Sequence, residues 1–341
     1  MIYSSMMSPG CFSLPTILTF IAISVLALDL VLFDTLLPSG QVTKNLTHAS
    51  ANSSSCFRNE DRLFVCITSY NNPLRSGNLD LIMESLAGLC TSSGMGIDVK
   101  LFITEFDHPY NPGQTLPRGL TIEQKWRDKE LKHHFSGSCR PEMNFSLTRR
   151  THTHYLYLED DIIITSQNLE YLCLEFKHLD TTENSGFRPG LLRYEVKRVD
   201  SGTDVNVLKV LTDNSLCCPP QIDAVVELEG RSYIVPRNPY EASYFLTSKQ
   251  LKMLAAETQY TSVLTSAKGL IREHHAGLWL SGLVTKVVPL DSFEKSLVLH
   301  ISGNYVNNSL PSAEIYLKAA TTFAGKPIAL NQLGYEDGKM V

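Results

Sequence analysis

Three consecutive carboxylates, Glu159, Asp160 and Asp161, are the residues of this chain that most clearly could do chemistry. They follow the apolar segment 155–158 and precede three isoleucines at 162–164, so a buried strand would have to end among them. Adjacent carboxylates repel one another and lose hydration when they are buried, and a bound divalent cation relieves both effects. Because Mg²⁺ and Mn²⁺ prefer carboxylate oxygens, this acidic motif predicts a metal site. A solvated acidic turn between two strands is the alternative interpretation.

Other polar side chains at the ends of apolar segments could share this site. Thr68, Ser69 and Tyr70 end one such run, and their hydroxyls and aromatic ring could hold a nucleoside by hydrogen bonding and stacking. Ligands of open α/β sheets bind beyond the carboxyl ends of the strands, so we expect these residues to face the acidic motif. An ordinary polar loop would also explain them. His300 ends the run 297–299 and is a further candidate metal ligand, although a lone histidine is more often structural.

Glu273 lies near the start of a predicted helix, beside Arg272 and the pair His274 and His275. A carboxylate there could act as a general base, with the neighbouring cations adjusting its pKa. A solvated first-turn glutamate favoured by the helix dipole is the plainer alternative. The two histidines are adjacent rather than four residues apart, and no pair of cysteines has zinc-site spacing. Zinc is therefore not expected.

The elements that would position these residues alternate between strands and helices. The apolar run 62–70, the helical pattern 79–89 and the apolar run 99–104 predict a βαβ unit. Continuous rather than alternating hydrophobicity is typical of strands that are covered on both faces, as in a parallel sheet. The predicted fold is α/β, with a mixed, mainly parallel sheet flanked by helices. Further strands are expected at 155–158, 190–194, 243–247, 284–288 and 297–300, two β-rich runs within 205–235 with a turn at 229–232, and helices at 168–176, 249–257 and 269–280.

The N-terminal region predicts entry into the secretory pathway. Residues 12–33 are almost wholly apolar, which approaches the roughly 20 residues that cross a bilayer as a helix. No lysine or arginine precedes Lys44, so charge does not indicate the orientation. A signal-anchor and a cleaved signal peptide both fit, and either would send the rest of the chain into the lumen. A buried helix of a soluble protein is the alternative.

The cysteines, the net charge and the glycosylation patterns bear on the compartment and the partners of the chain. Eight cysteines include Cys11 near the apolar segment, which leaves an odd number beyond it, and Cys66 in an apolar strand is the candidate for a buried free thiol. The net charge of −5, with no long basic run, makes nucleic acid an unexpected partner. N-glycosylation acceptor patterns begin at Asn45, Asn52, Asn144 and Asn307.

Five parts are expected along the chain: a short tail at 1–11, a transmembrane signal-anchor at 12–33, a stem at 34–60, a catalytic domain at 61–310 and a C-terminal tail at 311–341.

Together these features resemble the GT-A-type glycosyltransferases of the secretory pathway, which have a membrane anchor, a stem, a Rossmann-like nucleotide half and a DxD-type motif. The resemblance covers about residues 62–308, and the acidic motif matches a variant with Glu at the first position. It implies Mn²⁺ or Mg²⁺ as cofactor and a nucleotide-sugar donor. Asp161 would then be the direct metal ligand, with Glu159 and Asp160 at the ribose or at metal-bound water, and Ser69 and Tyr70 in the base and ribose pocket.

The same resemblance implies two more roles. His300 suits a C-terminal metal-ligand histidine, and Glu273 matches in part a late xED pattern that carries the catalytic base, with His274 in place of the aspartate. The base is needed only if the transfer inverts configuration, which the sequence leaves open; Glu241 is the next candidate.

The function implied is sugar transfer to a glycan, protein or lipid acceptor in the Golgi or ER lumen, by a single-pass membrane protein. A non-catalytic carbohydrate- or metal-binding lumenal protein of the same fold is the alternative. A hydrolase is disfavoured, because glycosidase carboxylates lie on opposite sides of the scissile bond.

Overall fold

A computed structural model describes one compact unit, Ser55–Val341, of the chain. The residues described within it are 56–69, 76–104, 109–112, 115–127, 136–180, 186–201, 204–212, 222–238, 240, 242–256, 284–301, 311–324, 335–336 and 339–340. The predicted anchor, most of the predicted stem and the predicted helix at 269–280 lie outside these residues. Among the residues described, no helix combines the length and the apolar character that crossing a bilayer requires.

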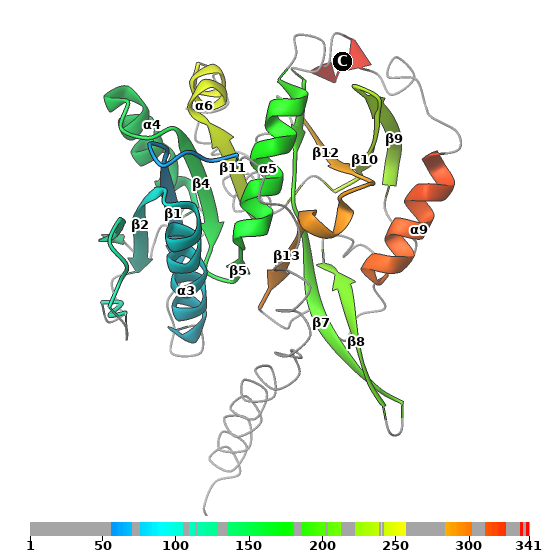
Figure 1. Ribbon diagram of the computed structural model, residues 1–341, viewed down its shortest axis with the longest axis horizontal. Coiled ribbons are helices and arrows are strands. Elements are labelled where there is room, and N and C mark those ends of the chain that lie inside the picture. Colours follow the sequence, from blue (N-terminus) through cyan, green and yellow to red (C-terminus); the bar gives the residue numbers. More distant parts are fainter. Residues whose placement is uncertain are drawn as a thin grey trace, which may run out of the picture. The chain divides into compact units, whose positions relative to one another are not determined.

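The main sheet has five strands in the order β11-β4-β1-β2-β3 (Figure 1). Neighbouring pairs among β3, β2, β1 and β4 are parallel, and β11 is antiparallel to β4. The predicted mixed, mainly parallel sheet is therefore confirmed, and the crossover from β1 to β2 contains α3. The bounds are β1 Arg62–Ser69, α3 Ser76–Ser93, β2 Gly96–Thr104, β3 Leu120–Arg127, β4 His154–Glu159 and β11 Ser243–Thr247.

Strand β1 is covered on both faces, which explains its unbroken apolar sequence. Leu63, Val65 and Ile67 pack in the same apolar cluster as the buried side of α3. Phe64 and Cys66 point the other way and pack in a second cluster with residues of α4 (Cys139–Arg149) and α6 (Ser248–Ala255). Because both faces of such a strand are buried, polar residues do not alternate with apolar ones along it. In the sequence, only the polar residues that follow show where the strand ends.

Helix α5 (Ser166–Leu179) follows the acidic motif and begins at a capping box. Thr165 accepts a hydrogen bond from the backbone N–H of Asn168, and the Asn168 side chain accepts one from the backbone of Thr165. The Asn168 amide also donates to the carbonyl oxygens of Lys295 and Leu297, at 2.8 and 2.9 Å. These bonds fix the chain just after the acidic motif against the strand that ends at His300.

Strands that follow β4 in the sequence form two further sheets of four strands each. One has the order β5-β13-β7-β8 and the other β6-β12-β10-β9. The predicted turn between β9 and β10 is confirmed at Glu229 and Gly230, whose φ angles of 49° and 75° are those of a tight hairpin. The bounds are β5 Ile162–Ile163, β6 Phe187–Pro189, β7 Leu192–Ser201, β8 Asp204–Leu211, β9 Ile222–Leu228, β10 Arg231–Pro236, β12 Thr285–Pro289, η4 Phe293–Ser296, β13 Leu297–His300, α9 Ala313–Ala324, β14 Tyr335–Glu336 and β15 Lys339–Met340.

The folded part is longer at both ends than the expected range 61–310. Cys56 and Phe57 are buried in the apolar core, although they fall within the predicted stem. At the other end, Ala313, Tyr316 and Ala320 of α9 are buried in an apolar cluster with residues of β7 and β9, so this part of the predicted tail belongs to the domain. The polar composition just before residue 56 concealed the first of these contacts.

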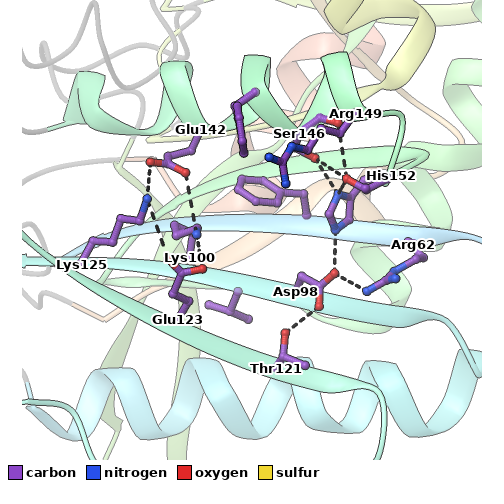
Figure 2. A pocket seen from close by; sticks show the side chains of 14 residues that line it. Arg62, Asp98, Lys100, Thr121, Glu123, Lys125, Glu142, Ser146, Arg149 and His152 are labelled. Carbon is purple, nitrogen blue, oxygen red and sulfur yellow. Dashed lines mark hydrogen bonds and ion pairs between the residues drawn. The ribbon is translucent and has the colours of Figure 1, made fainter.

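Helix α4 is joined to the sheet by charges as well as by apolar contacts (Figure 2). Lys125 of β3 donates to Glu142 of α4 at 2.6 Å, and Lys100 of β2 pairs with Glu142 at 3.8 Å and with Glu123.

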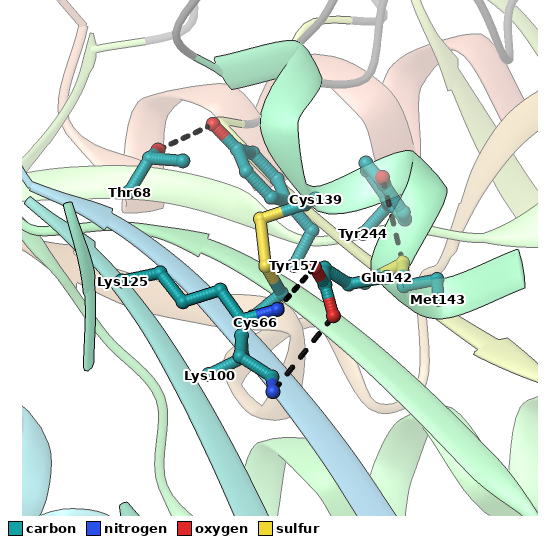
Figure 3. The surroundings of a disulfide bond; sticks show 9 residues. All are labelled: Cys66, Thr68, Lys100, Lys125, Cys139, Glu142, Met143, Tyr157 and Tyr244. Carbon is teal, nitrogen blue, oxygen red and sulfur yellow. Dashed lines mark hydrogen bonds and ion pairs between the residues drawn. A yellow bond between two sulfur atoms is a disulfide. The ribbon is translucent and has the colours of Figure 1, made fainter. Parts of the chain in front are cut away.

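The prediction of Cys66 as a buried free thiol is wrong. Cys66 forms a disulfide with Cys139, which ties the middle of β1 to the first turn of α4 (Figure 3). A second disulfide joins Cys56 to Cys173 of α5. Among the described cysteines, the buried Cys90 is the free thiol. Cys66 was indistinguishable from Cys90 in sequence, because both lie in apolar segments and the pairing depends on tertiary contacts.

Candidate functional site

The acidic motif lies at the carboxyl end of β4, beside the carboxyl end of β1. Thr68 and Glu159 face each other in the β1–β4 ladder, and the backbone N–H of Asp160 donates to the Thr68 carbonyl at 3.2 Å. Glu159, Asp160 and Asp161 are 5%, 1% and 3% exposed. A solvated turn would leave these carboxylates in water, so that alternative is wrong.

Separate hydrogen bonds hold the first two carboxylates. Ser69 Oγ donates to Asp160 Oδ2 at 3.0 Å, which confirms that the end of β1 meets the acidic motif. Tyr240 OH donates to Glu159 Oε1 at 3.2 Å, and the guanidinium of Arg193 stacks on the Tyr240 ring at 4.6 Å. Each carboxylate is thus oriented by a hydroxyl from another part of the chain.

Thr68 has a different environment from the one predicted. Its hydroxyl is 3.0 Å from Tyr157 OH in the buried interior, on the same side of β1 as the Cys66–Cys139 disulfide (Figure 3). Burial raises the pKa of Tyr157 well above its ordinary value, with a smaller contribution from the charge of Glu159. This contact favours a structural role for Thr68, whereas Ser69 on the opposite side of the strand reaches the acidic motif.

Asp161 and His300 meet because their strands are neighbours. Asp161 directly precedes β5, and His300 ends β13, where it pairs with Ile162. The backbone N–H of Ile301 donates to the Asp161 carbonyl at 2.9 Å. His300 Nε2 consequently lies 3.5 Å from Asp161 Oδ2, and both side chains are buried. The predicted proximity of these two candidate ligands is confirmed.

Glu195 on β7 lies on the other side of the His300 ring. Its Oε1 is 2.9 Å from His300 Nδ1, and the residue is 1% exposed. Burial of His300 disfavours its charged form, but hydrogen bonding with Asp161 and Glu195 outweighs this effect and raises the pKa of the imidazole. Asp161, His300 and Glu195 form a row of alternating acid, base and acid.

The chemistry of this donor set fits a hard divalent cation. No group of three or more histidine, cysteine and acidic side chains converges as a complete metal cage within the described part of the chain. Mg²⁺ and related ions do not need one, since one or two carboxylates, water and substrate phosphates commonly complete their shell. A carboxylate oxygen and an imidazole nitrogen 3.5 Å apart are close to the roughly 3 Å expected of neighbouring octahedral ligands with bonds near 2.1 Å.

Sequence reasoning missed Glu195, Tyr240 and Arg193. One signal was present: Arg193 and Glu195 alternate with Leu192 and Tyr194 in a strand, and charged residues at alternating positions of a buried strand face a polar site. Of the predicted site residues, Tyr70 and Glu273 lie outside the described residues, as does Glu241.

A groove of about 440 Å³ lies elsewhere, between α4 and the strands β1, β2 and β3 (Figure 2). Within it, Ser146 Oγ is 2.6 Å from His152 Nδ1, and His152 Nε2 is 2.7 Å from Asp98 Oδ2. The hydrogen bond from His152 holds the pKa of Asp98 well below its usual range, with help from Thr121 and Arg62.

This serine–histidine–aspartate row is not placed for nucleophilic catalysis. Ser146 lies in the last helical turns of α4, where the negative end of the helix dipole would oppose a developing oxyanion. The groove is also near the amino ends of the strands, whereas open α/β sheets bind ligands at the carboxyl ends. We therefore assign the row to fixing α4 on the sheet.

Comparisons with known proteins give little guidance. No family model matches the chain, and no curated protein matches it. Among solved structures, the crystal structure of a glycosyltransferase involved in the glycosylation of the major capsid of PBCV-1 is similar, with a TM-score of 0.33 and 9% sequence identity. The match covers 76% of this chain and 99% of that chain. Because identity and TM-score are both low, this likeness carries no functional conclusion.

Proposed function

We propose that this chain is a metal-dependent glycosyltransferase, which moves a sugar from a nucleotide-sugar donor to a glycan, protein or lipid acceptor. The observation that carries the proposal is the buried acidic motif at the carboxyl ends of β1 and β4, with His300 Nε2 3.5 Å from Asp161. Three buried acids gathered at the ligand-binding edge of an open α/β sheet suit a divalent cation, because carboxylate oxygens are the ligands that Mg²⁺ and Mn²⁺ prefer. The resemblance of the sequence to GT-A enzymes supports the same conclusion.

Asp161 and His300 are the residues that would hold Mn²⁺ or Mg²⁺. When bound, the cation supplies positive charge against the diphosphate that leaves as the glycosidic bond breaks, which is often a large contribution to catalysis. Ser69 and Tyr240 orient Asp160 and Glu159 through hydrogen bonds of 3.0 and 3.2 Å, so these carboxylates would meet the donor in fixed directions. Fixed polar groups stabilise a transition state without reorganising during the reaction.

Glu273 stays the proposed general base for an inverting transfer, where it would take the proton of the acceptor hydroxyl. A retaining transfer would leave it without that role, and Glu241 would be the next candidate.

A lumenal location is part of the proposal. The disulfides Cys56–Cys173 and Cys66–Cys139 support it, because disulfides persist in the secretory pathway and are rare in the reducing cytosol. Residues 12–33 would anchor the protein in the Golgi or ER membrane.

The experiment is a donor screen with the full-length chain. Purified protein is incubated with UDP- and GDP-sugars in Mn²⁺ or in EDTA, and release of UDP or GDP is measured. We expect slow hydrolysis of at least one donor in Mn²⁺ and none in EDTA. Tight donor binding without turnover, in the presence of acceptor glycans, would instead favour a non-catalytic binding protein. Neither binding nor hydrolysis with any donor would contradict the proposal.

A further inference from the structure

We propose that Glu195 is a positioning residue that fixes the imidazole of His300 for metal binding. The assignment rests on the proposed function, since it is the proposed metal that His300 would hold. In the row of Asp161, His300 and Glu195, the histidine lies between the two acids. Glu195 would therefore not bind the metal itself but would act through His300.

The sheet itself places the three side chains in a row. Strand β13 lies between β5 and β7, antiparallel to the first and parallel to the second. His300 pairs with Ile162, next to Asp161, and Leu299 pairs with Tyr194, next to Glu195. One further step along the β13–β7 ladder sets Glu195 opposite His300, whereas Asp161 lies in the turn just before Ile162 and its Oδ2 reaches His300 Nε2 at 3.5 Å.

The hydrogen bond between Glu195 and His300 determines which ring nitrogen is left for a metal. Nδ1 of His300 donates to Glu195 Oε1 at 2.9 Å, so a neutral imidazole carries its proton on Nδ1. Nε2, which lies 3.5 Å from Asp161 Oδ2, is then the ring nitrogen left with a lone pair for a metal. Metal-bound histidines commonly donate their other N–H to a carboxylate, which fixes the ring and makes it a better ligand.

The alternation of β7 argues against an incidental contact. Leu192 and Tyr194 pack with the apolar cluster that contains α9, so Arg193 and Glu195 must point to the opposite face. A carboxylate that is 1% exposed is unfavourable unless its charge is compensated and hydrogen-bonded. The 2.9 Å contact with His300 Nδ1 gives this buried carboxylate a hydrogen-bond donor and a role toward the histidine.

The test measures Mn²⁺ binding rather than activity. The full-length chain is titrated with Mn²⁺ alone and with Mn²⁺ plus UDP or GDP, and free Mn²⁺ is followed by its EPR signal. The variants are Glu195→Leu, Glu195→Gln, His300→Ala and the double variant E195L/H300A. Glu175→Gln is the matched control, since Glu175 is also buried but bonds Arg231 and Tyr233 in another network. The melting temperature without metal checks that each variant folds.

We expect Glu195→Leu to weaken Mn²⁺ binding by about 10–100-fold, the usual effect of losing such a supporting partner. Glu195→Gln keeps an oxygen acceptor for Nδ1–H and should lose less, and the control should bind as the parent does. Because Glu195 acts through His300, the double variant should bind no more weakly than His300→Ala.

Parent-like binding by both Glu195 variants would overturn the assignment; if Glu195→Leu does not fold, the Glu195→Gln titration decides alone. A double variant clearly weaker than His300→Ala would also overturn it, since Glu195 would then act independently of the histidine. A parent protein that binds no Mn²⁺, with or without nucleotide, would overturn the proposed function and this assignment with it.

Discussion

His154, the first residue of β4, is buried against two phenylalanines and should make the stability of the protein depend on pH. Its ring centroid lies 5.1 Å from that of Phe57 and 5.5 Å from that of Phe245. Burial lowers the pKa of His154, opposed by the charge of Asp61 and reinforced by that of Lys177. The folded state then binds fewer protons than the unfolded state, in which the pKa is about 6.5.

The free energy of unfolding should consequently fall as the pH drops through about 6.5, because protonation favours the unfolded chain. Replacing His154 by Phe should reduce this loss, and denaturant titrations at pH 8 and pH 5.5 would measure it. At pH 8, His154 is neutral in both the folded and the unfolded chain, so the variant should show only the effect of the changed packing. A variant that loses as much stability on acidification as the parent would show that other groups are responsible.

Single residues differ in how far the sequence could predict them. The acidic motif, Ser69 and His300 were predictable because each ends an apolar run, and strand ends gather at one edge of a sheet. Glu195 was not, since its role depends on β7 and β13 pairing across about a hundred residues of chain. The prediction for Cys66 was wrong for the same reason, because its disulfide partner Cys139 in α4 comes from a distant segment of the chain.

At the scale of elements, the Cys66–Cys139 disulfide should stabilise the domain by joining β1 to α4. Its two cysteines are separated by 73 residues, so the bond shortens a long loop of the unfolded chain. Removing both cysteines as C66A/C139A should lower the free energy of unfolding by about 2–5 kcal/mol, measured by chemical denaturation.

The variant C90A is the control for loss of buried sulfur, because Cys90 is a buried free thiol. It should cost clearly less than the double variant. Equal losses in the two variants would mean that packing of sulfur, rather than the covalent link, accounts for the effect.

Elements with a distinct apolar run were predictable, and elements without one were not. Strand β1 is continuously apolar over 63–67 and β4 over 155–158, and β11 matches the predicted 243–247 at both ends. Strand β3 was not predicted, since exposed and half-buried residues dominate it at the edge of the sheet. Helix α4 was missed because its sequence is mostly polar, and a disulfide and ion pairs supplement its few apolar contacts with the sheet.

At the scale of the whole molecule, the α/β class followed from the βαβ pattern, because parallel strands require a crossover and alternate with helices. The limits of the domain did not follow, since Cys56, Phe57 and α9 join the core through contacts distant in sequence. The anchor, the stem and Glu273 belong to segments outside the described residues, and they stay predictions.

The central claim is that the acidic motif binds a nucleoside diphosphate through a divalent cation. The most direct measurement is the increase in melting temperature that UDP or GDP causes in Mn²⁺, compared with EDTA, for the full-length parent and for Asp161→Asn. This substitution keeps the shape of the side chain and removes one charge. Asp180→Asn is the control, since Asp180 ends α5 and pairs with Lys249 at 2.6 Å, in a separate part of the domain.

We predict that one nucleotide stabilises the parent and the Asp180→Asn control in Mn²⁺ but not in EDTA. Asp161→Asn should fold and show no Mn²⁺-dependent stabilisation, because a neutral amide oxygen binds a hard cation much more weakly than a carboxylate does. Undiminished Mn²⁺-dependent stabilisation of Asp161→Asn, or equal stabilisation of the parent in Mn²⁺ and EDTA, would contradict the claim.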